Sequence, residues 1–272
     1  LAFLDHLSKS RLNLCFGPGS VTSDHELFGL KMKDGAAMVK EATEIILYLW
    51  SHDPPYEYDG QFWQIKLKET VEAEIGLGFI HRPLQQPLPP IWLPAMSLNS
   101  PSMKYAAKKG FLPIGHCLVP GNILADNWNV YEQAALEAGR QPKRSDWSIA
   151  RSIFLADTTA EAQQRVRSNS LGKNFEYIGG LFDRGLGRRI YKRDQEMSDA
   201  DCNMDYWLEE QIIAGDVDHA LERLLKLIDE TGPFGTLVLM SYDWDDKESW
   251  LHSMDLFVNE LMPALNKAVG VV

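Results

Sequence analysis

A run of small polar residues joins a predicted buried strand to a predicted helix. The strand is expected at residues 90–95 and the helix at 100–109, with Ser100-Pro101 in the N-cap and first-turn positions. Hydroxyl groups and free backbone N–H groups at a helix start attract anions, because the helix dipole places partial positive charge there. Ordinary capping by Ser100 is the alternative. We predict an anion-binding loop with the candidate residues Met96, Ser97, Asn99, Ser100 and Ser102.

A glycine-rich turn follows another predicted strand, at residues 11–17. Glycine lets a ligand approach the backbone closely, so Gly17, Gly19 and Ser20 are candidate binding residues. A simple tight turn is the alternative interpretation.

One histidine stands at the end of the predicted strand 111–117. An imidazole titrates near neutral pH, so His116 is the candidate for proton transfer, and a purely structural histidine is the alternative. The adjacent Cys117 is expected to be a small buried apolar residue. No pattern of metal ligands accompanies these residues, and we predict no metal site.

The elements that must position these loops alternate along the chain. Strands are predicted at 11–17, 90–95, 111–117, 146–156 and 235–240, and helices at 34–51, 100–109, 123–138, 160–168, 216–230 and 250–268. Alternation of this kind predicts an α/β fold whose parallel sheet is covered by helices, either open or closed into a barrel. Since no GxGxxG sequence links a strand to a helix, a dinucleotide-binding fold is disfavoured. The chain 1–272 is interpreted as a single domain.

Two segments interrupt the alternation. Residues 56–66 are predicted to form a hairpin with Asp59-Gly60 as its two-residue turn. Residues 169–201 are predicted to be an insertion. The aromatic residues in and after it would form either a lid over an apolar substrate cavity, or internal packing or a dimer contact; they are Phe175, Tyr177, Tyr191, Tyr206 and Trp207. Its basic segment 184–193 is expected to be a solvated face.

Composition restricts the class of protein. The net charge of −11 would repel a nucleic-acid backbone, and no apolar run reaches the ~20 residues needed to span a membrane. The three cysteines are widely spaced, as expected of reduced thiols, and a cytoplasmic location is predicted.

Several motifs in order resemble the bacterial luciferase-like flavin monooxygenases. They are LDHLSKSRL at 4–12, Gly17-Pro18-Gly19, Phe28-Gly29, the hairpin YEYDGQFWQI, the strand PIWLPA, YAAKKG at 105–110, IFLADT at 153–158 and Ala214-Gly215-Asp216. Within the family, the chain is most similar in appearance to the diketocamphane and limonene monooxygenases. The resemblance implies a (β/α)8 TIM barrel. Since the motif at 4–12 precedes the family's fourth strand, it implies about the last five strand–helix units, without roughly the first three.

The resemblance also implies an activity. Family members use reduced FMN, supplied by a separate NAD(P)H:flavin reductase, with O2 as co-substrate, and this chain would oxidise a small apolar ketone, aldehyde or terpene. The FMN phosphate would lie at Ser100 and Ser102, and Pro18 stands where luciferases have a phosphate-binding arginine. A homodimer is expected, with the helix at 34–51 as a contact face. Two alternatives stay open: an F420-dependent oxidoreductase of the same superfamily, and a non-catalytic flavin-binding shortened barrel.

Overall fold

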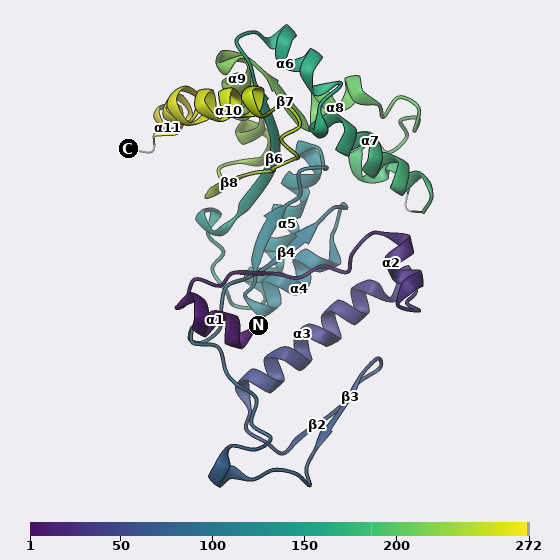
Figure 1. The fold of residues 1–272 in the computed structure, drawn as a ribbon, viewed down its shortest axis with the longest axis vertical. Helices are drawn as coiled ribbons and strands as arrows, with labels where there is room; N and C mark the ends of the chain where they lie inside the picture. Colours follow the sequence, from purple (N-terminus) through teal and green to yellow (C-terminus); the bar gives the residue numbers. More distant parts are fainter. Residues whose placement is uncertain (186, 271–272) are drawn as a thin grey trace. The chain divides into compact units, whose positions relative to one another are not determined.

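The computed structural model describes residues 1–185 and 187–270, and the chain divides into two compact units, Leu1–Leu93 and Pro94–Val272 (Figure 1). The first unit contains the helices α1 (Ala2–Ser8), α2 (Thr22–Leu27) and α3 (Gly35–Ser51), with 3-10 turns at Met32–Asp34 and Ala73–Ile75. The strand β1 (Leu14–Cys15) pairs in parallel with β4 (Ile91–Ala95), Leu14 opposite Ile91. The predicted helix at 34–51 is confirmed, whereas the predicted strand at 11–17 shortens to two residues.

The hairpin of the first unit consists of β2 (Tyr56–Asp59) and β3 (Gln64–Leu67), paired antiparallel with Asp59 opposite Gln64. Its connection is therefore the four residues 60–63, and the prediction of a two-residue Asp59-Gly60 turn is wrong. The cause lies in α3. The buried Glu41 carboxylate accepts hydrogen bonds from the backbone N–H groups of all three residues 61–63, so the loop is wrapped around an anion.

The second unit is organised around the strand β6 (Ser148–Leu155), all eight residues of which are buried. Its first half pairs in parallel with β5 (Leu112–Gly115) and with β8 (Thr236–Leu239), and its second half pairs in parallel with β7 (Ile212–Gly215). The sequence WSIARSIFLA has strong β character, and its polar members Ser148, Arg151 and Ser152 are buried together with its apolar residues. Among the described residues, the strand pairings do not close into a ring.

Helices accompany these strands. They are α4 (Pro101–Lys109), α5 (Gly121–Glu137), α6 (Thr159–Val166), α7 (Ser170–Asp183), α8 (Met204–Glu210), α9 (Val217–Thr231), α10 (Lys247–Leu256) and α11 (Met262–Val269), with 3-10 turns at Arg144–Asp146 and at η4 (Arg188–Tyr191) and a π-helical turn at Phe257–Leu261. The predicted mixed α/β class with parallel strands is confirmed. The sequence interpretation missed β7, which it treated as a turn, and α7 and α8, which lie in or after the predicted insertion.

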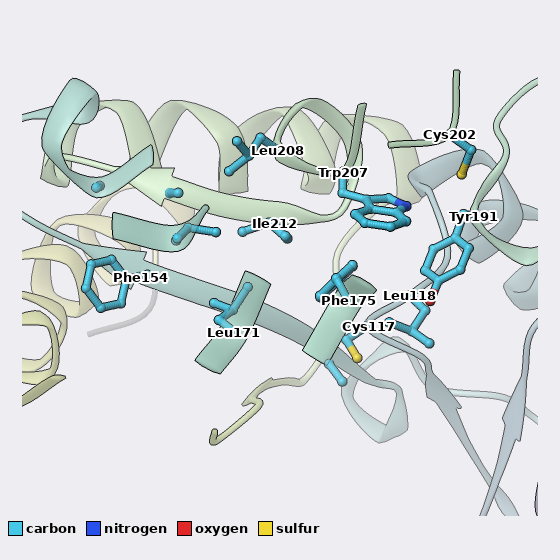
Figure 2. Close-up of a cluster of buried hydrophobic side chains, with 14 of the residues drawn as sticks. Cys117, Leu118, Phe154, Leu171, Phe175, Tyr191, Cys202, Trp207, Leu208 and Ile212 are labelled. Atoms are coloured by element: carbon cyan, nitrogen blue, oxygen red, sulfur yellow. The ribbon is translucent and has the colours of Figure 1, made fainter. Parts of the chain in front are cut away.

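A cluster of buried side chains joins α7, η4 and α8 to β6 and β7 (Figure 2). The rings of Phe175, Tyr191 and Trp207 lie within it, and Trp207 has its centroid 5.7 Å from that of Phe175 and 5.4 Å from that of Tyr191. Phe175 and Tyr191 are 0% exposed and Trp207 is 2% exposed. These three aromatic residues therefore belong to the core, so for them the packing interpretation is correct and the lid interpretation is not. Tyr177, by contrast, is 62% exposed. Among residues 1–185 and 187–270, no helix is both long and apolar enough to cross a bilayer.

Candidate functional site

A cavity of about 370 Å³ follows the end of β4. The loop after β4 contributes Met96, Ser97 and Leu98 to its wall, α5 contributes Ile123, and the segment around η4 contributes Arg189, Ile190 and Gln195. The wall therefore combines four apolar side chains with one hydroxyl, one amide and one guanidinium. A hollow of this size with a mainly apolar wall and a few polar groups is typical of a small-molecule site.

The loop that forms this wall is fixed to α5. Asn99 adopts a left-handed conformation with φ of 50°, and its N–H donates to the Asp126 carboxylate at 2.6 Å. Left-handed backbone is tolerated better by asparagine than by most residues, so the local sequence suits this bend. The Asn99 N–H is consequently engaged within the protein. Its side chain lines a second hollow of about 170 Å³ beside Lys104 and Lys108.

Ser100 and Ser102 lie at the start of α4, as predicted, but Ser100 does not cap the helix. Ser100 occupies the N-cap position of α4 and is only 2% exposed, and its side chain makes no capping hydrogen bond. Capping by Ser100, the alternative considered from the sequence, is therefore not what this serine does. Ser102 is half-buried in the first turn. Since no described side chain caps α4, its first N–H groups keep their capacity to bind an anion.

The glycine-rich turn belongs to the first unit. Gly17 and Gly19 are exposed there and Ser20 is half-buried. Gly19 has φ of +72°, and a Cβ at this position would lie 3.7 Å from the His25 ring, at ordinary contact distance. The backbone conformation, rather than lack of space, is thus what favours glycine. A binding role for Gly17, Gly19 and Ser20 stays a prediction.

His116 lies directly after β5, in a turn that its own ring stabilises. Its Nδ1 accepts a hydrogen bond from the Leu118 N–H at 3.2 Å, so the neutral ring carries its proton on Nε2. Burial, and secondly the positive charge of Arg151, lower the pKa of His116 below the ordinary 6.5. At neutral pH this imidazole is therefore uncharged.

Cys117 confirms the prediction of a buried small residue, with an exposed fraction of 3%. Burial raises the pKa of its thiol to about 11, which keeps the sulfur protonated and weakly nucleophilic at neutral pH. Two hydroxyl groups nearby form a hydrogen bond: the Tyr242 hydroxyl lies 2.5 Å from the hydroxyl of the buried Ser152.

Sequence reasoning missed the cationic part of the cavity. Arg189 and its neighbours fall in the segment 184–193, which was expected to be a solvated face. Residue 186 lies outside the described residues. The expectation is wrong for Lys192, which is 5% exposed, and for Arg193, which forms ion pairs with Glu210 and Glu230. Gln195 donates to the carbonyls of Arg189 and Lys192 and so supports the η4 backbone. No local pattern marks Arg189, because only the tertiary fold places it in the wall of the same cavity as Met96 and Ser97.

Comparison with known proteins identifies the family. A family model described as luciferase-like monooxygenase matches residues 1–233. The chain is 29% identical over 245 residues to 3,6-diketocamphane 1,6-monooxygenase of Pseudomonas putida, an alignment that covers 87% of this chain and 64% of that protein. It is 22% identical over 272 residues to limonene 1,2-monooxygenase of Rhodococcus erythropolis, covering 99% of this chain and 65% of that protein. The chain thus spans less than two thirds of either relative.

The fold agrees with this result. The structure is similar, with a TM-score of 0.80 and 27% identity, to the oxygenating constituent of 3,6-diketocamphane monooxygenase from Pseudomonas putida, a type II Baeyer–Villiger monooxygenase solved in complex with FMN. The similarity covers 96% of this chain and 73% of that one. The family model, the relatives and the fold agree, and the chain belongs to the luciferase-like monooxygenase family.

Proposed function

We propose that this chain is the main part of an FMN-dependent monooxygenase that uses reduced FMN and O2 to oxidise a small apolar ketone, aldehyde or terpene. The observation that carries the proposal is the cavity of about 370 Å³ after β4, where Met96, Ser97 and Arg189 meet. The names of the two relatives, which act on diketocamphane and limonene, support an apolar substrate.

The groups that line the cavity fit a flavin mononucleotide. Met96, Leu98, Ile123 and Ile190 offer apolar surface for a ring system. The Ser97 hydroxyl and the exposed Arg189 guanidinium offer donors for a phosphate, and arginine is well suited to phosphate because its planar group donates two parallel hydrogen bonds. In this proposal Arg189 supplies the positive charge for the phosphate. In luciferases an arginine at the position of Pro18 has this role. Ser100 and Ser102 would act through the N-terminus of α4.

When bound, reduced FMN would supply the electrons that oxygen activation requires. The role of the chain is to hold the phosphate at Ser97 and Arg189 and to keep water from the apolar wall. His116 is uncharged at neutral pH and carries its proton on Nε2, so this nitrogen is the proposed donor in proton transfer. A separate flavin reductase is the proposed electron source, which accords with the relative being described as an oxygenating constituent. We also propose a homodimer.

The test compares FMN with riboflavin, which lacks only the phosphate. Binding of each flavin to the full chain is followed by tryptophan fluorescence, for the wild type and for Arg189→Gln. A hydrogen-bonded charge pair contributes about 1.5–3 kcal/mol, so the substitution should weaken FMN binding by about 10- to 150-fold and leave riboflavin binding unchanged. Arg184→Gln is the matched control, since Arg184 is an exposed arginine that ends α7 outside the cavity wall.

Each outcome has a distinct meaning. A folded wild type that binds neither flavin refutes the proposed function. Equal losses for FMN and riboflavin in Arg189→Gln refute only the phosphate role of Arg189. Preference for F420 over FMN would favour the deazaflavin alternative, and tight FMN binding without oxygen-dependent turnover of any apolar ketone, aldehyde or terpene would favour the non-catalytic alternative.

A further inference from the structure

A separate, much smaller cavity lies among α5, β6, β7 and α9, on a different set of residues from the proposed flavin site. Its volume is about 30 Å³, and its wall includes Gly121, Arg151, Arg193, Glu210, Arg223 and Glu230. A cavity needs roughly 10–15 Å³ to hold one water molecule, so this one accommodates a particle somewhat larger than water. It is far too small for a nucleotide or a flavin.

Arg151 is the unusual member of this wall. It projects from the fully buried strand β6 and is only 2% exposed. Its Nη1 donates to the Ala150 carbonyl at 3.0 Å and to the His116 carbonyl at 3.4 Å, while its Nη2 is buried with no hydrogen-bond partner among the described residues. Burial lowers the pKa of Arg151 to about 10, so the group is still cationic at neutral pH. A buried cation with an unused donor is costly unless a ligand completes it.

The charges around the cavity do not balance. Arg193 is held by both Glu210 and Glu230. Arg223, like Arg151, donates to backbone carbonyls, in its case those of residues 208 and 209. Three arginines therefore face two carboxylates. Two further residues at the exposed rim, Glu209 and Lys226, cancel each other, so the residues that line the cavity carry one net positive charge. Glu222, which is not part of the wall, also acts electrostatically on Arg223.

The start of α5 also borders the cavity. Gly121 is the first residue of this 17-residue helix, and no described side chain caps it. The first N–H groups of a helix carry partial positive charge. The Glu230 carboxylate lies beside this helix start, since a Cβ added at Gly121 would lie 2.0 Å from its Oε2.

We propose that this cavity binds one small monovalent anion of the size of chloride, held by Arg151 Nη2 and Arg223. The unused donor of the buried Arg151 and the one net positive charge of the wall favour a monovalent anion, and the volume sets its size. The anion would immobilise Arg151, whose Nη1 holds the carbonyl of His116. Anion binding would thereby stabilise the turn that carries the proposed proton donor.

The first test is thermal unfolding of the full chain in chloride or bromide, compared with gluconate, which is too large for the cavity, at constant ionic strength. A site that exists only in the folded state raises Tm with anion concentration, by about 3–5 °C per tenfold increase above the dissociation constant. Chloride and bromide should show this rise and gluconate should not. Bromide should also appear as an anomalous scatterer beside Arg151 in crystals.

Variants assign the effect to the cavity. Arg223→Met removes the excess charge and should abolish the chloride-specific rise in Tm, whatever its effect on stability. Arg151→Lys provides a second variant, because lysine keeps the charge but loses the donor fork, and should at least halve the rise. Arg165→Met is the control, since Arg165 forms surface ion pairs with Glu161 and Asp246 and does not line the cavity. Equal Tm values in chloride and gluconate for the wild type would overturn the proposal and leave the cavity to water. Bromide density without a chloride-specific rise would mean an adventitious ion only, and would overturn it as well.

Discussion

Replacing Glu41 by glutamine should open the hairpin loop of the first unit. The carboxylate of Glu41 is 8% exposed, and its two oxygens accept four hydrogen bonds from the N–H groups of residues 61–63 at 2.9–3.2 Å. The side chain of glutamine has nearly the same shape but only one oxygen. The substitution therefore removes the charge and turns one acceptor into a donor that faces the Gln61 N–H.

The size of the effect follows from these contacts. Two hydrogen bonds change from charged to neutral, which costs about 1 kcal/mol each, and an unpartnered buried N–H costs about 1–3 kcal/mol. Gln61 and Trp63 are exposed residues, and water can replace part of the loss. We therefore expect a loss of about 2–3 kcal/mol in the free energy of opening the loop, equivalent to roughly 30- to 150-fold.

Hydrogen exchange is the suitable assay because it measures local opening rather than global unfolding. Peptides that cover residues 56–67 should exchange about 30- to 150-fold faster in Glu41→Gln than in the wild type. Glu57→Gln is the control: Glu57 lies on β2 of the same hairpin, but its carboxylate is exposed and pairs with Lys68 at the surface. Exchange in Glu41→Gln as slow as in Glu57→Gln would refute the conclusion that Glu41 determines the loop.

Three further predictions concern the second unit. Because burial lowers the pKa of His116 below 6.5, the unfolded state binds more protons in acid, so wild-type stability should fall as the pH drops below about 6.5. In urea unfolding His116→Asn should show a flatter pH dependence; an equally steep one would contradict this. Phe175→Ala empties a 0% exposed position and should lower the free energy of unfolding by about 3–5 kcal/mol, against little change for the 62% exposed Tyr177→Ala. Tyr242→Phe removes one partner of the buried Ser152 hydroxyl, which also has a side-chain hydrogen bond with Cys117, and should cost about 1 kcal/mol. In a double-mutant cycle with Ser152→Ala the two losses should not add, and strict additivity would argue against the contact.

Local patterns in the sequence were sufficient for most elements. The periodic apolar residues of α3 and α9 and the strong β character of the β6 sequence predicted these elements to within a few residues, because helix and strand preferences depend mostly on neighbouring residues. The short strand β7 was missed, since a four-residue apolar run does not distinguish a strand from a turn. Its pairing with β6 is what makes it a strand.

Contacts between residues far apart in the sequence decided the rest. Thr158 caps α6, whereas Asp157, immediately before it, pairs with His252, 95 residues away in the sequence. By contrast, the sequence by itself determined the family, the α/β class and the loop after β4, because the order of motifs and the local periodicity depend only on the order of residues along the chain. Only the tertiary structure brought Arg189 to that loop, and left Arg151 buried with an unused donor, because the partner of a long side chain depends on distance in space and not on position in sequence.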